Sequence, residues 1–305
     1  MERHLTTRAG VRAVVEKYGL AAKKKLGQHF LVDGHVLDKI LNAANIGSGD
    51  VVLEIGPGIG GLTQGLLGRG ARVIAVELDK QLVPILQSQF AGENLTVVQG
   101  DILRVDLPEI LKFGAATTTE SPELETDATT KTEKPELETG ATVKVVANLP
   151  YYITTPVIMH LLESGIPFAS ITVMIQKEVA QRMAASPGTK DYGALTLAVQ
   201  YYADVYLAAN VPVNCFMPRP GVDSAVAHLQ LLGQPRVDVS KERLFKIIHA
   251  AFNHRRKTLV NNLDSAGFGN GKEHLAEILQ SCGLDPQVRG ETLSIFQFAQ
   301  LAREL

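Results

Sequence analysis

Residues 51–61, with the sequence VVLEIGPGIGG, decide the fold of this chain. A short run of apolar, mostly β-branched residues leads into Gly56, Gly58 and Gly61, which fit the pattern G-x-G-x-x-G. Glycines at this spacing let the backbone turn tightly and approach a bound ligand closely. The stretch therefore predicts the first strand, turn and helix of a nucleotide-binding α/β fold.

The same alternation of strand and helix continues on both sides of this turn. Near-continuous apolar strands separated by helices indicate a parallel sheet that is covered on both faces. We therefore predict an α/β fold with a doubly wound, Rossmann-like sheet. The expected strands are Val51–Ile55, Val73–Val76, Leu95–Val98, Val143–Ala147, Ile171–Ile175, Val205–Val211 and Ser224–Leu231, with helices such as Leu62–Leu67 and Lys80–Phe90 between them.

The strand pattern ends at about Ser240, and amphipathic helices follow. These helices are expected at Glu242–Phe252, Thr258–Ser265, Glu273–Cys282 and Ser294–Arg303. The sequence thus predicts a basic N-terminal arm at 1–30, an α/β domain at 31–235 and a small all-helical domain at 236–305.

Residues 114–142 interrupt the α/β pattern. They contain seven acidic and two basic residues, almost no large apolar side chain, and a near-repeat of Pro-Glu-Leu-Glu-Thr at 122–126 and 135–139. Such a segment cannot bury enough surface to offset the entropy of ordering it. We predict a disordered acidic insert, and we favour a tolerated insertion over a docking site for a partner.

Composition and charge exclude several classes of protein. The chain has 305 residues, 45% of them hydrophobic, and it contains neither an apolar run that could span a bilayer nor an apolar leader, so we expect no membrane association and a cytoplasmic location. The two cysteines, Cys215 and Cys282, are too far apart to suggest a disulfide framework or a metal site. Basic residues cluster at Lys23, Lys24 and Lys25 and at Arg255, Arg256 and Lys257, which suits either a polyanion partner or a solvated surface.

Three acidic residues sit at or near the ends of the first three strands. Glu77 ends the second strand, where an acid commonly binds ribose hydroxyls, and this fits a nicotinamide enzyme as well as a methyltransferase. Glu54, two residues before Gly56, is typical of S-adenosylmethionine sites. Asp101 follows the third strand and could accept a hydrogen bond from the adenine amino group, although a turn or helix-cap role is the alternative.

The fourth strand ends in Asn148-Leu-Pro-Tyr151, which has no role in hydride transfer. The Asn148 side-chain oxygen can accept one N6–H of adenine, and the carbonyl of Leu149 or Pro150 can accept the other. Tyr151 supplies a flat face on which the base can stack. These groups would aim the poorly nucleophilic N6 at a methyl donor, so that positioning supplies most of the acceleration. Phe216 could cover the other face of the base, or be a buried phenylalanine; both remain open.

With these motifs in view, the chain resembles the dimethyladenosine transferases of small-subunit ribosomal RNA. The matching segments occur in the family's order along nearly the whole chain, and their joint order is much more specific than any one of them. They are Lys24–Leu31, Glu54–Gly60, Glu77, Asp101, Asn148–Tyr151, Gln176–Ala180, Lys190–Gly193, Phe216–Ser224, Phe252–Leu259 and Arg289–Leu293.

The resemblance implies a class I methyltransferase sheet and S-adenosyl-L-methionine as the cofactor. It also implies dimethylation of two adjacent adenosines in the 3′-terminal hairpin loop of 16S rRNA, with 16S rRNA in the immature small subunit as the partner. The family's cofactor contacts carry over to His29, Leu31, Gly56, Glu77, Asp101 and Asn148, and the glycine pattern adds Gly58. His29 and Tyr152 depart from the asparagines that are common at these positions.

Three other functions compete with this interpretation. A macrolide-resistance methyltransferase of 23S rRNA shares the glycine and Asn-Pro-Tyr motifs, but the segments around Gln176 and Arg255 disfavour it. A non-catalytic ribosome assembly factor is disfavoured by the intact Glu77, Asp101 and Asn148. A nicotinamide oxidoreductase is disfavoured by Asn148–Tyr151. We expect a monomer without a bound metal.

Overall fold

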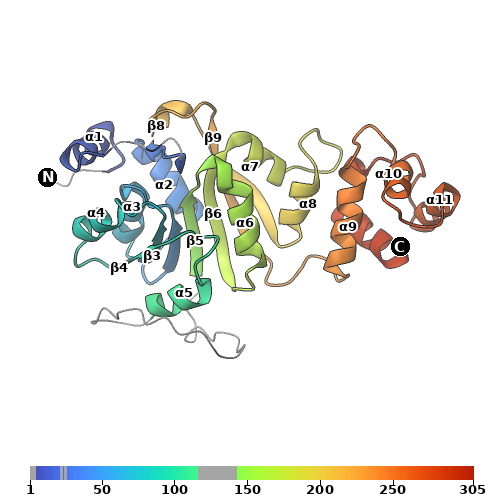
Figure 1. The fold of residues 1–305 in the computed structure, drawn as a ribbon, viewed down its shortest axis with the longest axis horizontal. Helices are drawn as coiled ribbons and strands as arrows, with labels where there is room; N and C mark the ends of the chain where they lie inside the picture. The colour runs from blue at the N-terminus through green and yellow to red at the C-terminus, as the bar shows by residue number, and fades with distance from the viewer. Residues whose placement is uncertain (1–4, 21–22, 24–25, 116–142) are drawn as a thin grey trace. The chain divides into compact units, whose positions relative to one another are not determined.

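The computed structural model describes residues 5–20, 23, 26–115 and 143–305 (Figure 1). Most of the predicted acidic insert, residues 116–142, therefore lies outside the described residues, as do Lys24 and Lys25. Gly114 and Ala115 form the end of helix α5 (Leu107–Ala115). None of the described helices has the length and apolar character needed to cross a membrane.

A seven-stranded sheet forms the centre of the fold, in the order β4-β3-β2-β5-β6-β9-β7. Its strands are β2 (Val51–Ile55), β3 (Arg72–Glu77), β4 (Leu95–Gln99), β5 (Val143–Asn148), β6 (Phe168–Gln176), β7 (Ala203–Val211) and β9 (Ser224–Leu231). The pairs β4–β3, β3–β2, β2–β5 and β5–β6 are parallel, which confirms the predicted α/β class. The last strand of the sequence, β9, lies between β6 and β7.

The strand order places the glycine turn at the point where the direction of winding changes. From β2 the chain builds outward through β3 and β4, and then returns to β5 on the other side of β2. In open parallel sheets, ligands bind in the crevice at the carboxyl ends of the strands that flank such a point. The helices of this region are α2 (Gly34–Ala43), α3 (Gly61–Gly68), α4 (Val83–Gln89) and α6 (Thr154–Glu163).

Helix α1 (Arg8–Lys17), within the described residues 5–20, packs onto the α/β region. It buries Val11 and Val14 in a cluster that also contains Ile59, next to the glycine turn. Strand β1 (Phe30–Leu31) pairs antiparallel with β8 (Phe216–Met217). This two-residue pairing joins residues 30–31 to the segment that follows β7.

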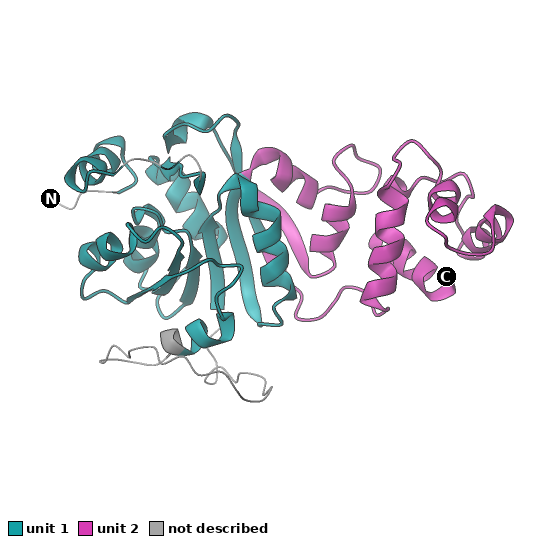
Figure 2. Cartoon of the chain, viewed as in Figure 1, with its two compact units in different colours: residues 1–175, 208–228 teal, residues 176–207, 229–305 magenta. Residues whose placement is uncertain are grey.

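The chain forms two compact units (Figure 2). Unit 1 contains residues 1–175 and 208–228, and unit 2 contains residues 176–207 and 229–305. Unit 2 begins at 176 rather than near 235, because α8 packs against α9, and unit 1 has no boundary at 30. The three-part division stays a prediction about domains. The helices of unit 2 are α7 (Lys177–Met183), α8 (Ala194–Gln200), α9 (Lys241–Phe252), α10 (Leu259–Ser265), α11 (Lys272–Ser281) and α12 (Ile295–Glu304).

Candidate active site

One pocket in unit 1 brings together every residue that the sequence predicts for cofactor binding and chemistry. Its walls come from the ends of β2, β3 and β5, the turn after β4, the segment before β1, and β8. The predicted residues that line it are His29, Leu31, Gly56, Gly58, Glu77, Asp101, Asn148, Pro150, Tyr151 and Phe216.

The glycine turn has a backbone that other residues would adopt only with strain. Gly56 has a φ of 68° and Gly58 a φ of 61°. A Cβ atom on Gly58 would also lie 3.3 Å from the ring of Phe30. The turn thus brings bare backbone to the pocket wall, as a closely approaching ligand requires.

Glu77 links this turn to the end of β3. Its Oε2 accepts a hydrogen bond from the Gly58 N–H at 3.0 Å, and its Oε1 accepts one from the Asp79 N–H at 2.7 Å. The side chain is mostly buried, and this burial raises the pKa of Glu77 although the two N–H groups lower it. Each carboxylate oxygen keeps a second lone pair that can accept a hydroxyl proton.

Asp101 forms a turn after β4, which is the alternative role considered for it above, and it also lines the pocket. Its Oδ1 accepts a hydrogen bond from the Leu103 N–H at 3.1 Å, and its Oδ2 lies 3.8 Å from Arg104 Nε. The side chain is 36% exposed, so the carboxylate remains accessible to a ligand.

Glu54 has a supporting position behind the pocket. It is fully buried, and its Oε2 accepts a hydrogen bond from Thr63 Oγ1 on α3 at 2.7 Å. Burial is the main cause that raises the pKa of Glu54 to about 8, and Oε1 has no partner among the described residues. The carboxyl group therefore ties β2 to α3 instead of contacting a ligand directly.

The end of β5 fixes the orientation of the Asn148 amide. Asn148 Nδ2 donates a hydrogen bond to the His29 carbonyl at 3.0 Å. Because a carbonyl can only accept, the NH2 group must face His29, and Oδ1 is the atom left for a ligand. The Pro150 carbonyl accepts hydrogen bonds from the Ile153 N–H and from Thr154 Oγ1.

The aromatic residues around the pocket differ in exposure. Tyr151 is half-buried, whereas Phe216 is only 1% exposed and belongs to the apolar cluster of the sheet. Tyr152, which stands where an asparagine is common in the family, is 55% exposed and lies against Gly27 at the pocket. Leu78 is a second exposed apolar residue of the lining. It was not predicted, although it directly follows Glu77 at the end of β3.

Comparison with known proteins shows the family to which this chain belongs. The model of the family described as ribosomal RNA adenine dimethylase matches residues 19–303. The chain belongs to that family. It is therefore an S-adenosylmethionine-dependent enzyme that methylates adenine in ribosomal RNA, and the oxidoreductase alternative is wrong.

Individual relatives agree with this assignment. The chain is 49% identical, over 95% of its length and 93% of the relative, to a ribosomal RNA small subunit methyltransferase A of Lachnoclostridium phytofermentans. It is 44% identical to the protein of the same name in Clostridioides difficile, over 98% and 96% of the two chains.

Solved structures show the same architecture. A dimethyladenosine transferase from Plasmodium falciparum superposes with a TM-score of 0.69 at 26% identity, covering 90% of this chain and 97% of that one. The 23S rRNA methyltransferase ErmE gives a TM-score of 0.63 at 24% identity, over 90% and 99% of the chains. This second likeness shows a common fold.

The pocket of this dimethylase fits S-adenosylmethionine. The positive φ at Gly56 and Gly58 leaves backbone without side chains at the pocket, and Glu77 and Asp101 place two carboxyl groups at the ends of neighbouring strands. Carboxyl oxygens accept the hydroxyl and amino hydrogens that a nucleoside presents. The same pocket also contains the Asn148–Tyr151 turn, where the methyl acceptor is expected.

The first basic cluster has one described member, Lys23, and it is engaged within unit 1. Lys23 Nζ lies 2.7 Å from Asp79 Oδ1, and Gln28 Nε2 donates to Asp79 Oδ2 at 3.2 Å. These bonds tie the segment before β1 to the loop after Glu77. Asp79 was not among the residues predicted from the sequence, although its place two residues after Glu77 is a signal for it.

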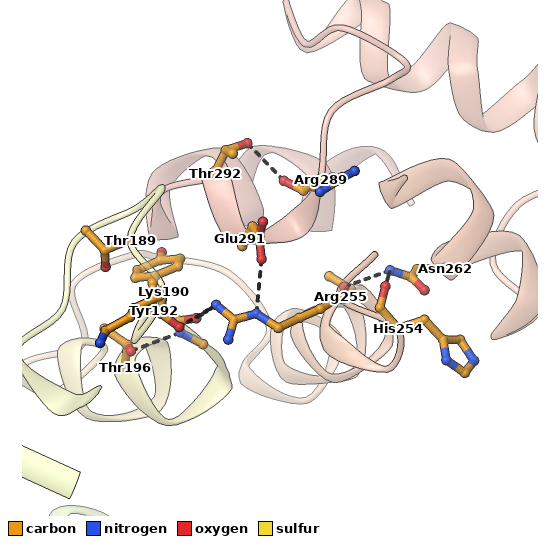
Figure 3. A network of polar contacts seen from close by, with 12 residues as sticks. Thr189, Lys190, Tyr192, Thr196, His254, Arg255, Asn262, Arg289, Glu291 and Thr292 are labelled. Carbon is orange, nitrogen blue, oxygen red and sulfur yellow. Dashed lines mark hydrogen bonds and ion pairs between the residues drawn. The ribbon is translucent and has the colours of Figure 1, made fainter. Parts of the chain in front are cut away.

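The second basic cluster lies in unit 2, and Figure 3 shows the polar contacts of its first member, Arg255. Arg255 forms an ion pair with Glu291 at 3.0 Å and donates to the carbonyls of Lys190, at 2.6 Å, and Tyr192, at 3.2 Å. It therefore holds the loop before α8. Arg256 and Lys257 are exposed on the surface beside it.

Proposed function

We propose that this dimethylase converts two adjacent adenosines in the 3′-terminal hairpin loop of 16S rRNA to N6,N6-dimethyladenosine during small-subunit biogenesis. It would act as a cytoplasmic monomer, away from membranes, on the immature small subunit. The observation that carries the chemistry is the orientation of Asn148, whose Oδ1 is left free for an N6–H. The choice of the small subunit is supported by the relatives named for it at 43–49% identity.

We propose the following roles for the cofactor-binding residues. S-adenosylmethionine, when bound, supplies a methyl group made electrophilic by its sulfonium sulfur. Glu77 would bind the ribose hydroxyls and Asp101 the adenine amino group of this cofactor. Gly56 and Gly58 would allow the close approach of backbone, and His29, Leu31 and Asn148 would contact the cofactor from the other wall.

On the acceptor side, the chain would hold adenine N6 with two oxygens. Asn148 Oδ1 accepts one N6–H. The Leu149 carbonyl is the better candidate for the second, because the Pro150 carbonyl already accepts two hydrogen bonds. Tyr151 stacks on the base, and Pro150 and Phe216 provide apolar walls. With both N6–H groups bound, positioning and charge placement account for the acceleration without a strong base.

Basic residues would hold the RNA through its phosphates. We propose Lys23, Lys24, Lys25, Arg255, Arg256 and Lys257 for this role. Since Lys23 and Arg255 have protein partners at 2.7 and 3.0 Å, Arg256 and Lys257 are the stronger candidates among the described members.

A methyl-transfer assay tests the proposed function. Purified protein is incubated with tritiated-methyl S-adenosylmethionine and small subunits whose 16S rRNA lacks these methyl groups, and the RNA nucleosides are then separated. We expect label in N6,N6-dimethyladenosine from the 16S 3′-terminal loop. Label in large-subunit RNA instead would favour the resistance-type enzyme, and label in neither would favour an assembly factor. Sedimentation velocity tests the monomer.

A further inference from the structure

The hydroxyl end of Tyr151 is anchored to the central sheet. Tyr151 Oη lies 2.7 Å from Ser224 Oγ, a hydrogen-bond distance. Ser224 is the first residue of β9 and is 1% exposed, so its position is set by the sheet. The bond joins the short 3-10 helix at Tyr151–Ile153 to a strand that lies 73 positions later in the sequence.

One face of the Tyr151 ring is occupied by His29. The two rings are stacked, with centroids 5.9 Å apart and planes 27° from parallel. The His29 ring is itself held by a hydrogen bond between Nδ1 and the Pro218 carbonyl at 2.8 Å. The His29 main-chain carbonyl accepts the hydrogen bond from Asn148 Nδ2. The tyrosine and the asparagine of the turn are thus oriented by the same neighbour.

These contacts restrain the two side-chain torsions of the tyrosine. Stacking on His29 limits the tilt of the ring, and the bond to Ser224 fixes the direction in which the hydroxyl points. Burial raises the pKa of the Tyr151 phenol, so the hydroxyl stays protonated and able to donate. An aromatic ring held in this way is already ordered before the substrate binds. Stacking of the base then costs less conformational entropy of the side chain.

We propose that Ser224 is a positioning residue for methyl transfer: through its hydrogen bond with Tyr151, it fixes the ring face on which the substrate adenine stacks. Ser224 itself does not touch the substrate. The proposal rests on the proposed function for the role of Tyr151, and it adds a residue from β9 to the machinery. Without the bond, the ring would stack on the base over a wider range of angles, and fewer complexes would hold N6 in line with the methyl group.

A double-mutant cycle tests this role. Ser224→Ala and Tyr151→Phe each remove the same hydrogen bond, and Tyr151→Phe keeps the aromatic ring. We expect either variant to lower kcat on small subunits by about three- to tenfold, the effect of one net hydrogen bond, while the dissociation constant for S-adenosylmethionine stays unchanged. The double variant should lose no more than one single variant, because the two residues act through one bond.

Thr172→Val is the matched control. Thr172 lies on the neighbouring strand β6, is fully buried, and has a hydroxyl bonded to His228 Nδ1 at 2.8 Å outside the pocket lining. This variant should lower thermal stability and leave kcat unchanged, which separates a local effect at the pocket from general loosening of the sheet.

Two results would overturn the proposal: a wild-type kcat in Ser224→Ala, or losses that multiply in the double variant. If Ser224→Ala fails to fold, an unchanged kcat in Tyr151→Phe overturns it equally. The wild-type protein reports separately on the proposed function. If it labels only large-subunit RNA, the proposed substrate is wrong, and the same ratios measured on that RNA still decide the role of Ser224.

Discussion

At the scale of single residues, Asn148 separates the binding of the cofactor from the transfer of the methyl group. We expect Asn148→Ala to lower methyl transfer by about 100-fold or more, as the loss of an oriented polar group at a reacting atom does. Its amide is oriented by His29 through one hydrogen bond, and the change removes that bond together with the acceptor oxygen. The measurement is single-turnover transfer of labelled methyl to small subunits.

Cofactor affinity, measured by calorimetry, is the control for this change. Asn148→Ala should keep affinity within a few-fold, whereas Asp101→Ala should weaken it, because we place Asp101 against the adenine of the cofactor. Equal turnover in Asn148→Ala and wild type would remove the mechanism. A similar loss of cofactor affinity in both variants would contradict the assignment of transfer to Asn148 and of cofactor binding to Asp101.

Glu54 makes stability depend on pH. Its pKa is about 8 in the folded chain and near its ordinary value of 4.5 in the unfolded chain. Between these values the folded state binds the extra proton, so the free energy of unfolding falls as the pH rises from about 4.5 to about 8. We expect Glu54→Gln to reduce this loss of stability, because glutamine remains neutral. Urea unfolding over the same pH range measures it.

Glu77 contributes to the same trend, since burial raises its pKa too. For that reason the slope of stability against pH should become smaller in Glu54→Gln without reaching zero. Parallel curves for the variant and the wild type would show that Glu54 is ionised in the folded chain.

At the scale of elements, the start of α3 depends on a glycine that no other residue can replace without strain. Gly60 has a φ of 90°, and an added Cβ would lie 2.5 Å from the ring of Phe90. We expect Gly60→Ala to destabilise the fold by more than about 2 kcal/mol, from backbone strain plus the collision, and to weaken cofactor binding. Thermal unfolding and calorimetry measure the two effects.

Gly92→Ala is the matched control for Gly60→Ala. Gly92 has a φ of 85°, but nothing lies within 4 Å of an added Cβ. Only the strain of about 1–2 kcal/mol is then expected, with unchanged cofactor affinity. Equal losses of stability in the two variants would contradict the role assigned to the collision with Phe90.

The elements also show what could be predicted from sequence and what could not. Strands Val51–Ile55 and Ser224–Leu231 were predicted at the bounds that the structure has. Val51–Ile55 is a nearly continuous apolar run, as is typical of a parallel strand that is buried on both faces. The insertion of β9 between β6 and β7 was not predicted, since periodicity carries no information on strand order. The pair β1–β8 is too short to give a pattern.

The pocket shows the same division between residues and their contacts. Motif spacing predicted the residues that line it, since the carboxyl ends of parallel strands meet at one edge of the sheet. It could not predict that Phe216 is buried or that Ser224 bonds to Tyr151, because both depend on packing between distant segments. Charge clustering likewise did not distinguish Arg255, which holds a loop, from the exposed Arg256.

At the scale of the whole molecule, binding to RNA should depend steeply on salt. The net charge is −2, so attraction to a polyanion must come from local clusters rather than from overall charge. Arg256→Gln combined with Lys257→Gln should reduce the slope of log affinity against log salt by roughly 1.5 to 2, as expected for two lost phosphate contacts. Filter binding between about 50 and 200 mM salt measures this slope.

Arg255→Gln is the comparison for these changes, because it removes the ion pair with Glu291 and two bonds to carbonyls. It should lower thermal stability, whereas the pair of substitutions at 256 and 257 should not. A wild-type affinity that does not respond to salt would refute the proposed grip on phosphates.

The discontinuity of the two units sets an order of events during synthesis of the protein. Translation completes residues 1–175 of unit 1 first, then the first part of unit 2, and only afterwards the segment 208–228 that closes unit 1. Ser224 therefore reaches Tyr151 late. The Tyr192 hydroxyl finds its acceptor later still, because the Leu293 carbonyl is 101 positions further along the chain than Tyr192. A nascent chain that ends at residue 207 still lacks Phe216, which lines the pocket, so the pocket can be completed only after most of the chain has been translated.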